Sequence, residues 1–355
     1  MAEQVTVKTK FGQYNVLVGN SLDYGKLARE VKKPCQVIIV SDDNVFPLYG
    51  ENTEKSFREN GFQTNRFIIK SGESSKNIST ITNLLEFLAS VGVTRADMLV
   101  ALGGGVIGDM TGFAAAIYLR GIPYMQLPTT ILAAVDSSVG GKTGVDLPAG
   151  KNLVGAFHQP IGVFCDTNAF ASLPKEVYSD GMAEVIKHGM IADKELLLSL
   201  LDQKEHSARL TIADICRRNV AIKANVVEQD EFDVGVRMLL NFGHTVGHAV
   251  EVLSGYQISH GKAVAMGMMI ETKASEKSGL TEKPCSDHLK AVLKHYDLPV
   301  GCDYSAKELA KAALQDKKRF GETISLIIPR EMGRAELIQH PVAQLEDFIA
   351  KGLGE

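Results

Sequence analysis

Short apolar runs alternate with amphipathic segments along the first half of the chain. Five runs rich in branched residues predict buried strands, at residues 36–40, 66–69, 98–102, 122–127 and 163–165. Segments with helical spacing lie between them, at residues 80–90 and 106–119. This alternation predicts an α/β fold in which a mostly parallel, Rossmann-like sheet is covered by helices on both faces.

The pattern changes near Pro174, where longer helical segments replace the strand-like runs. Helices are predicted at residues 175–191, 209–227, 261–278 and 306–314, and a strand-like run at 323–328 predicts a short hairpin among them. A chain of 355 residues exceeds the usual size of one hydrophobic core. We therefore expect an α/β domain at residues 1–174 and a mainly helical domain at residues 175–355.

Composition narrows the possible classes of protein. Hydrophobic residues make up 45% and charged residues 23% of the chain, and a net charge of −4 predicts no binding of nucleic acid. No apolar run approaches the ~20 residues of a membrane span, and the N-terminus lacks an apolar signal core, so we expect a cytoplasmic protein. Five scattered cysteines without a C-x-x-C pair predict neither a disulfide framework nor a thiolate zinc site.

Histidines in the second half carry the strongest candidate chemistry. Read as a helix, residues 237–248 place His244 and His248 on one face. With His260 and Glu184, two imidazoles and a carboxylate are expected to bind one divalent metal and leave a position open, as in catalytic zinc sites. A threonine stands where the H-E-x-x-H motif has its general base, which disfavours peptide hydrolysis.

Glycine-rich segments in the first half indicate anion binding. Residues 103–108 match G-x-G-x-x-G between a predicted strand and a predicted helix, where backbone N–H groups bind a pyrophosphate. Asp42, at the end of an earlier strand, offers a carboxylate for a ribose. Lys142 and Lys151 lie beside further glycines, which suits a phosphate or a carboxylate. Asp136 stands where a Walker motif needs its first glycine, which excludes a nucleoside triphosphatase.

Taken in order, these segments resemble the 3-dehydroquinate synthase family over most of the chain. The resemblance rests on Gly103-Gly104-Gly105-Val106, Arg120-Gly121, Pro128-Thr129-Thr130, residues 136–142, Gly150-Lys151-Asn152, residues 183–187, residues 237–248 and Asp316-Lys317-Lys318. Many motifs in one order are far more specific than any one of them. The resemblance implies an N-terminal domain that binds NAD and a C-terminal domain that binds a metal and the substrate.

The resemblance also implies roles for individual residues. The implied metal ligands are Glu184, His244 and His260, with zinc expected and cobalt as the alternative. The implied NAD contacts are Asp42, Asn44, Glu73, Lys76, Gly104, Gly105, Val106, Asp109, Thr129, Thr130, Lys142 and Lys151. The implied substrate-binding and catalytic positions are Asp136, Lys142, Lys151, Asn152, Lys187, Lys223, Arg237, Asn241, His248 and one lysine of the Lys317–Lys318 pair, for which we take Lys317. Arg120 matches a residue that the neighbouring subunit contributes, so a homodimer is expected.

The family's reaction explains this mixture of groups. It converts the phosphorylated keto acid 3-deoxy-D-arabino-heptulosonate 7-phosphate into 3-dehydroquinate and phosphate in the shikimate pathway. In the implied sequence NAD oxidises the C5 alcohol, phosphate leaves, the hydride returns, and an aldol closure forms the ring, without net redox change. Candidates to hold the phosphate are His248, Asn241, Lys142 and Asn152, and candidates to position the carboxylate and hydroxyls are Lys223, Arg237 and Lys187.

Three other functions stay open at the level of the sequence. An NAD-dependent metal alcohol or glycerol dehydrogenase would leave Lys142, Lys151 and Asn152 without a purpose. Another sugar phosphate cyclase would share most motifs, and a catalytically silent relative would bind cofactors without releasing phosphate. The chain also departs from the family pattern twice: Lys262 replaces the usual Glu of His-Gly-Glu, which would disfavour a nearby cation, and residues 180–182 are larger than usual.

Overall fold

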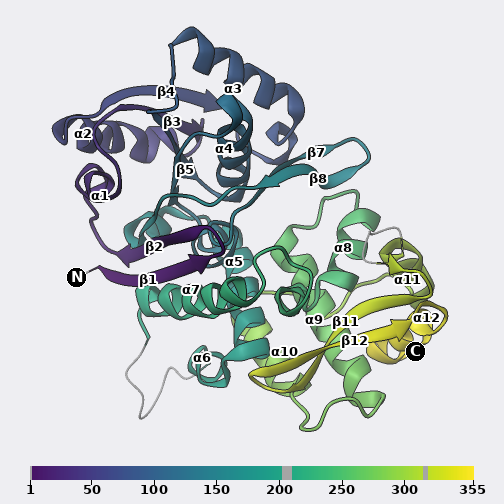
Figure 1. Ribbon diagram of the computed structural model, residues 1–355. Helices are drawn as coiled ribbons and strands as arrows, with labels where there is room; N and C mark the ends of the chain where they lie inside the picture. The colour runs from purple at the N-terminus through teal and green to yellow at the C-terminus, as the bar shows by residue number, and fades with distance from the viewer. Residues whose placement is uncertain (1, 202–209, 315–318) are drawn as a thin grey trace. The chain divides into compact units, whose positions relative to one another are not determined.

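The computed structural model describes residues 2–201, 210–314 and 319–355, which fall into two compact units (Figure 1). Unit 1 comprises Met1–Leu173 and Ile212–Glu231, and unit 2 comprises Pro174–Thr211 and Phe232–Glu355. The division differs from the expected domain ranges at two places, because Pro174 belongs to unit 2 and residues 212–231 belong to unit 1.

Unit 1 is built on a seven-stranded sheet of order β1-β2-β9-β6-β5-β3-β4. All neighbouring strands pair in parallel except β1 and β2. The strands are β1 (Glu3–Thr9), β2 (Gly12–Gly19), β3 (Gln36–Asp42), β4 (Gln63–Ile69), β5 (Met98–Gly103), β6 (Tyr124–Pro128) and β9 (Val163–Asp166). The expected mostly parallel α/β sheet is confirmed, and the antiparallel β1–β2 hairpin is an addition that the sequence did not predict.

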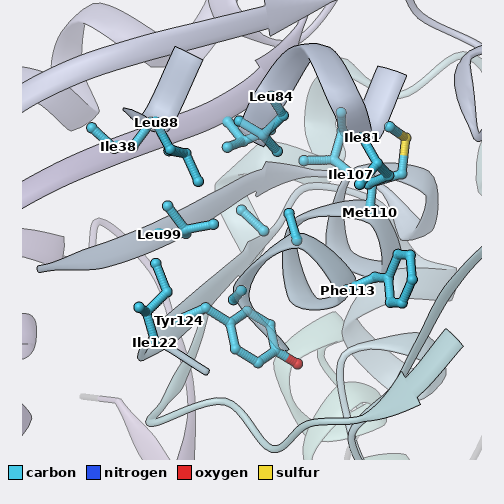
Figure 2. Close-up of a cluster of buried hydrophobic side chains, with 14 of the residues drawn as sticks. Ile38, Ile81, Leu84, Leu88, Leu99, Ile107, Met110, Phe113, Ile122 and Tyr124 are labelled. Atoms are coloured by element: carbon cyan, nitrogen blue, oxygen red, sulfur yellow. The ribbon is translucent and has the colours of Figure 1, made fainter. Parts of the chain in front are cut away.

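Helices cover both faces of this sheet. They are α1 (Tyr24–Val31), α2 (Glu51–Glu59), α3 (Ile78–Ser90), α4 (Gly105–Ile117) and α7 (Ile212–Gln229). Alternate residues of a strand point to opposite faces, so Ile38 and Leu99 pack with α3 and α4 (Figure 2), whereas Ile39 and Val100 belong to the core on the other side. Helix α7 packs against β1 and β2.

Two further strands of unit 1, β7 (Lys142–Leu147) and β8 (Gly150–Phe157), form an antiparallel hairpin. Glycines permit their close approach, because a Cβ on Gly144 would lie only 2.6 Å from the carbonyl oxygen of Val154. Asp146 near the hairpin turn pairs with Asn77 at the start of α3. The sequence did not predict this hairpin.

Unit 2 is mainly helical, as expected. Its elements are α5 (Lys175–Ala192), α6 (Lys194–Ser199), α8 (His244–Leu253), α9 (His260–Lys277), α10 (Ser286–His295), α11 (Ala306–Ala313), α12 (Leu345–Leu353), β10 (Arg319–Phe320), β11 (Thr323–Glu331) and β12 (Arg334–Pro341). Side chains of α8, α9, α11, α12 and the buried strand β11 share one core. The predicted strand at 323–328 is part of β11, which forms the expected hairpin with β12. Among the described residues, no helix is both long and apolar enough to cross a bilayer.

Candidate functional site

Three helices of unit 2 bring Glu184, His244 and His260 together. Glu184 lies fully buried within α5, and the two histidines are the first residues of α8 and α9. A carboxylate oxygen of Glu184 lies 3.8 Å from Nε2 of His244 and 3.5 Å from Nε2 of His260. One ligand atom from each residue lies within 4.8 Å of the other two. This spacing allows one ion to contact all three side chains.

Outer partners orient both imidazoles. Because a carbonyl can only accept, Nδ1 of His244 donates to the Phe242 carbonyl at 3.1 Å, and its Nε2 lies on the side of Glu184. Nδ1 of His260 faces the buried Glu251 carboxylate at 3.6 Å. Metal-binding histidines commonly bond the metal through one ring nitrogen and a carbonyl or carboxylate through the other. The donor set therefore fits a divalent cation such as zinc.

Cationic groups already lie beside the buried Glu184 carboxylate. Burial alone would lower the pKa of His260, but the carboxylates of Glu184 and Glu251 outweigh burial and raise this pKa to about 10. Lys187, less than one turn along α5 and also buried, forms an ion pair with Glu184. Within the described part of the chain, neither carboxylate oxygen of Glu184 accepts a hydrogen bond of regular geometry. A metal ion that binds Glu184 and His260 would therefore take the place of the His260 proton.

His248 lies next to this cluster. Its ring centroid is 5.3 Å from that of His244, and its Nε2 lies 4.0 Å from the Glu251 carboxylate. His248, Glu251 and His260 form a second group with metal-ligand spacing. Glu184, His244 and His260 are the better ligand set, because both imidazoles turn Nε2 toward Glu184. Their Nδ1 atoms contact the Phe242 carbonyl and the Glu251 carboxylate instead.

The segment before His244 is not one continuous helix with it. Gly243 adopts a left-handed conformation (φ 77°), so α8 begins only at His244. Arg237 and Asn241, two predicted substrate-binding residues, lie in a separate 3-10 helix, Val236–Asn241. Arg237 is nevertheless almost completely buried. The predicted shared face of His244 and His248 is retained within α8.

In unit 1 the glycine turn lies between β5 and α4, at the carboxyl edge of the sheet. Gly104 precedes α4 and has no side chain to cap it, so the first N–H groups of α4 suit an anion. A Cβ on Gly104 would lie 3.2 Å from the Thr130 side chain. Asp42 ends the adjacent strand β3, where its carboxylate accepts from the N–H groups of Asn44 and Val45, both at 2.9 Å. Nucleotides bind at this edge of α/β sheets.

Lys76, Asp109 and Asn152 form a compact network beside this edge. The Lys76 ammonium, 5% exposed, donates to Asp109 at 2.7 Å and to Asn152 at 2.6 Å. Burial lowers the pKa of Lys76, but Asp109 and then Glu73 outweigh burial and raise it. Burial raises the pKa of Asp109. The sequence assigned Lys76 and Asp109 to NAD and Asn152 to substrate, and the structure brings all three into contact.

A second pair of predicted substrate residues meets between α7 and residues 133–137. Lys223 of α7 forms an ion pair with the Asp136 carboxylate, and its ammonium also donates to the Asp136 carbonyl at 2.6 Å. Lys223 is buried although it is charged. Lys151 lies 3.8 Å from the half-exposed Glu73 carboxylate.

Four other positions singled out in the sequence are not part of the clusters described above. Lys142, the first residue of β7, is exposed. Arg120 is exposed and adopts a left-handed conformation (φ 67°). Lys262 is half-buried, and its N–H bonds to the Asp180 carboxylate. Lys317 lies outside the described residues.

Sequence reasoning missed Glu251. Its spacing offered a signal, because it follows His248 by three residues and His244 by seven and therefore shares their helix face.

Comparison with known proteins decides the family. The sequence-family model of the 3-dehydroquinate synthase N-terminal domain matches residues 66–180, and the family model of the C-terminal domain matches residues 181–319. The 3-dehydroquinate synthase of Streptococcus suis is 41% identical over 353 residues, which cover 98% of this chain and 99% of that protein. The chain belongs to the 3-dehydroquinate synthase family. The resemblance recognised in the sequence motifs is thereby confirmed.

Solved structures share the fold. The 2-epi-5-epi-valiolone synthase of Streptomyces hygroscopicus, solved with NAD+ and Zn2+ bound, is 26% identical with a TM-score of 0.85 over 96% of each chain. An iron-containing alcohol dehydrogenase reaches a TM-score of 0.69 at 14% identity, covering 100% of this chain and 99% of that one. The second likeness concerns the fold alone, so the fold does not distinguish a dehydroquinate synthase from an alcohol dehydrogenase.

Proposed function

We propose that this member of the 3-dehydroquinate synthase family converts 3-deoxy-D-arabino-heptulosonate 7-phosphate into 3-dehydroquinate and phosphate. The observation that carries the proposal is the convergence of Glu184, His244 and His260 in a chain that is 41% identical to a 3-dehydroquinate synthase over 98% of its length. Family membership indicates the reaction, and this cluster supports the presence of a metal site for it.

Two cofactors complete the proposed site. Glu184, His244 and His260 would hold a divalent cation that could polarise a substrate hydroxyl, and the turn after β5 would hold NAD+, which would supply hydride chemistry. Zinc is the proposed cation, because two imidazoles and a carboxylate are a common catalytic zinc set, and cobalt is the alternative. The proposed NAD-binding residues are Asp42, Asn44, Glu73, Lys76, Gly104, Gly105, Val106, Asp109, Thr129, Thr130, Lys142 and Lys151.

The remaining residues bind and orient the substrate. His248, whose ring lies 5.3 Å from that of His244, is proposed to hold the phosphate together with Asn241, Lys142 and Asn152. The proposed contacts to the carboxylate and hydroxyls are Lys187, Lys223 and Arg237, with Asp136 holding Lys223 in place. Lys151 and Lys317 are further proposed substrate-binding residues. Orienting a flexible substrate lowers the barrier by several kcal/mol, on the order seen in well-oriented intramolecular reactions.

A phosphate-release assay tests this function. The metal-loaded protein is given 3-deoxy-D-arabino-heptulosonate 7-phosphate with and without catalytic NAD, while phosphate, NADH and the organic product are followed. We expect phosphate release that requires NAD and accumulates no NADH. NADH accumulation from simple alcohols would instead indicate a metal-dependent alcohol or glycerol dehydrogenase. A different carbocyclic product from another sugar phosphate would indicate another sugar phosphate cyclase. A protein that binds both cofactors but turns over no substrate would be a catalytically silent relative.

We also propose that the enzyme is a cytoplasmic homodimer. The support is the family match of Arg120, an exposed residue in an unusual left-handed conformation, to a position that reaches the neighbouring subunit. Light scattering gives the mass in solution. Mixing an Arg120→Ala subunit with a subunit that lacks another catalytic residue tests whether activity returns in the mixed dimer.

A further inference from the structure

Each proposed ligand histidine is the first residue of its helix, so its position depends on how that helix begins. His244 starts α8 and His260 starts α9. Neither helix is capped by the side chain of its own preceding residue, Gly243 or Ser259. Because the first four N–H groups of a helix have no acceptor within it, a buried helix start needs acceptors from elsewhere.

The start of α8 is capped by Glu271, which lies on α9 and is 1% exposed. One carboxylate oxygen accepts from the Gly243 N–H at 2.9 Å, and the other accepts from the Val246 N–H at 3.2 Å. The two bonds hold the backbone on both sides of His244. A negative charge at this position also interacts favourably with the helix dipole.

The start of α9 is held in a similar way by Asp180, which lies on α5 one turn before Glu184. One oxygen of Asp180 accepts from the Ser259 hydroxyl at 2.5 Å and from the Lys262 N–H at 3.1 Å. The helices meet closely here, because a Cβ on Gly261 would overlap the Asp180 carbonyl. Asp180 belongs to the segment that departs from the usual family pattern.

The two caps connect the three ligand-bearing helices in series. Asp180 on α5 holds the start of α9, and Glu271 on α9 holds the start of α8. Close packing of α8 on α9 reinforces this order, because a Cβ on Gly267 would overlap the Gly243 carbonyl. We infer that Asp180 and Glu271 are positioning residues of the metal site, which place the Nε2 atoms of His260 and His244 beside Glu184. This inference rests on the proposed function, whose metal site it deepens.

Helix α9 supplies a matched control. Glu276 accepts from the N–H groups of Cys285 and Ser286 at 2.7 and 2.8 Å and so caps the start of α10 from a neighbouring helix. None of the proposed ligands lies on α10. Glu276→Gln therefore removes an interhelical cap of the same chemistry without changing the start of a ligand-bearing helix.

The test compares the full-length wild type with the variants Glu271→Gln, Asp180→Asn and Glu276→Gln. Chelator competition gives the zinc affinity, the visible absorption of the cobalt-loaded protein reports ligand geometry, and thermal unfolding of the metal-free protein reports stability. We expect Glu271→Gln to weaken zinc about 10- to 100-fold, the usual effect of losing an outer partner, and to shift the cobalt spectrum. Because Asp180 is only half-buried, Asp180→Asn should weaken zinc binding by no more than about tenfold.

Glu276→Gln should lower the melting temperature as Glu271→Gln does, yet change zinc affinity by less than about twofold. Unchanged zinc affinity in Glu271→Gln would overturn the inference, since the residue would then serve helix stability alone. Equal losses in Glu271→Gln and Glu276→Gln would also overturn it, because the effect would come from global stability. If Glu271→Gln does not fold, Glu271→Asp, whose carboxylate is on a shorter side chain, is tested in its place. Wild-type zinc affinity in Glu271→Asp would then count against the inference. A wild type that binds no zinc would instead refute the proposed metal site itself.

Discussion

Two buried charged clusters, one in each unit, differ in how their charges are satisfied. In unit 1 the Lys76 ammonium contacts Asp109 and Asn152, acceptors that match it, at 2.7 and 2.6 Å. In unit 2 a Glu184 carboxylate oxygen lies 3.8 and 3.5 Å from Nε2 of His244 and His260, and the same carboxylate forms an ion pair with Lys187. The first cluster is a network of one ammonium and two acceptors, whereas the second gathers two imidazoles and a carboxylate, groups that bind a divalent cation once His260 has lost its proton. The chemical type of the gathered side chains thus separates a charge network from a metal-ligand set.

The contrast between the two clusters would fail most completely if Glu184 were dispensable for metal binding. Glu184→Gln should weaken zinc by more than the ~100-fold upper range for losing an outer partner, because it removes a ligand itself. Chelator competition measures the change. Glu176→Gln, at an exposed position of the same helix, is the control and should bind zinc like the wild type. Similar affinity in both variants would mean that the cluster is not the metal site.

Acid should weaken zinc binding. Burial lowers the pKa of His260, but Glu184 and Glu251 raise it overall to about 10 in the absence of metal, so the imidazole is protonated at neutral pH. A metal ligand must be deprotonated, so binding releases this proton, and the dissociation constant should rise about tenfold for each pH unit below this pKa. Calorimetry in buffers of different ionisation enthalpy counts the proton. A dissociation constant that stays flat across this range is incompatible with His260 as a ligand.

Replacing His248 separates a substrate-binding role from a ligand role within the same cluster. His248→Ala should lower kcat about a hundredfold, the size expected when a reacting group is misplaced by about 1 Å, and change zinc affinity less than about threefold. Steady-state kinetics and chelator competition give the two values. His295→Ala, at an exposed position on α10, should alter neither. A large loss of zinc from the His248 variant would make His248 a ligand.

The network in unit 1 should affect stability rather than the metal. Lys76→Met leaves the Asp109 carboxylate without its ammonium partner, so the free energy of unfolding should fall by about 2 kcal/mol, less than the 3–5 kcal/mol for a fully buried pair. The expected loss of stability is smaller because the Asp109 side chain is 21% exposed and therefore partly solvated. Denaturant unfolding of Lys76→Met, Asp109→Asn and the double variant gives the coupling energy. Weaker zinc binding in these variants would remove the contrast between the clusters.

The fold was predictable where the hydrophobic pattern was strong. The parallel strands of unit 1 are continuous apolar runs because both faces of their sheet are covered, as in β5, where all six residues are buried. The β1–β2 hairpin was missed because its residues are mixed and half-exposed. Helix α7 was assigned to the second domain because amphipathicity shows that a helix has a buried face without identifying the neighbour that covers it.

The sequence by itself determined the family, the fold class and the candidate ligand types, because motif order and hydrophobic periodicity are written along the chain. Only the tertiary structure decided that His244 and His260 turn Nε2 toward Glu184, and that Phe242 and Glu251 orient them. It alone revealed the caps by Asp180 and Glu271. The physical reason is that these contacts join residues from separate helices, and their distances depend on helix packing, which local periodicity does not encode.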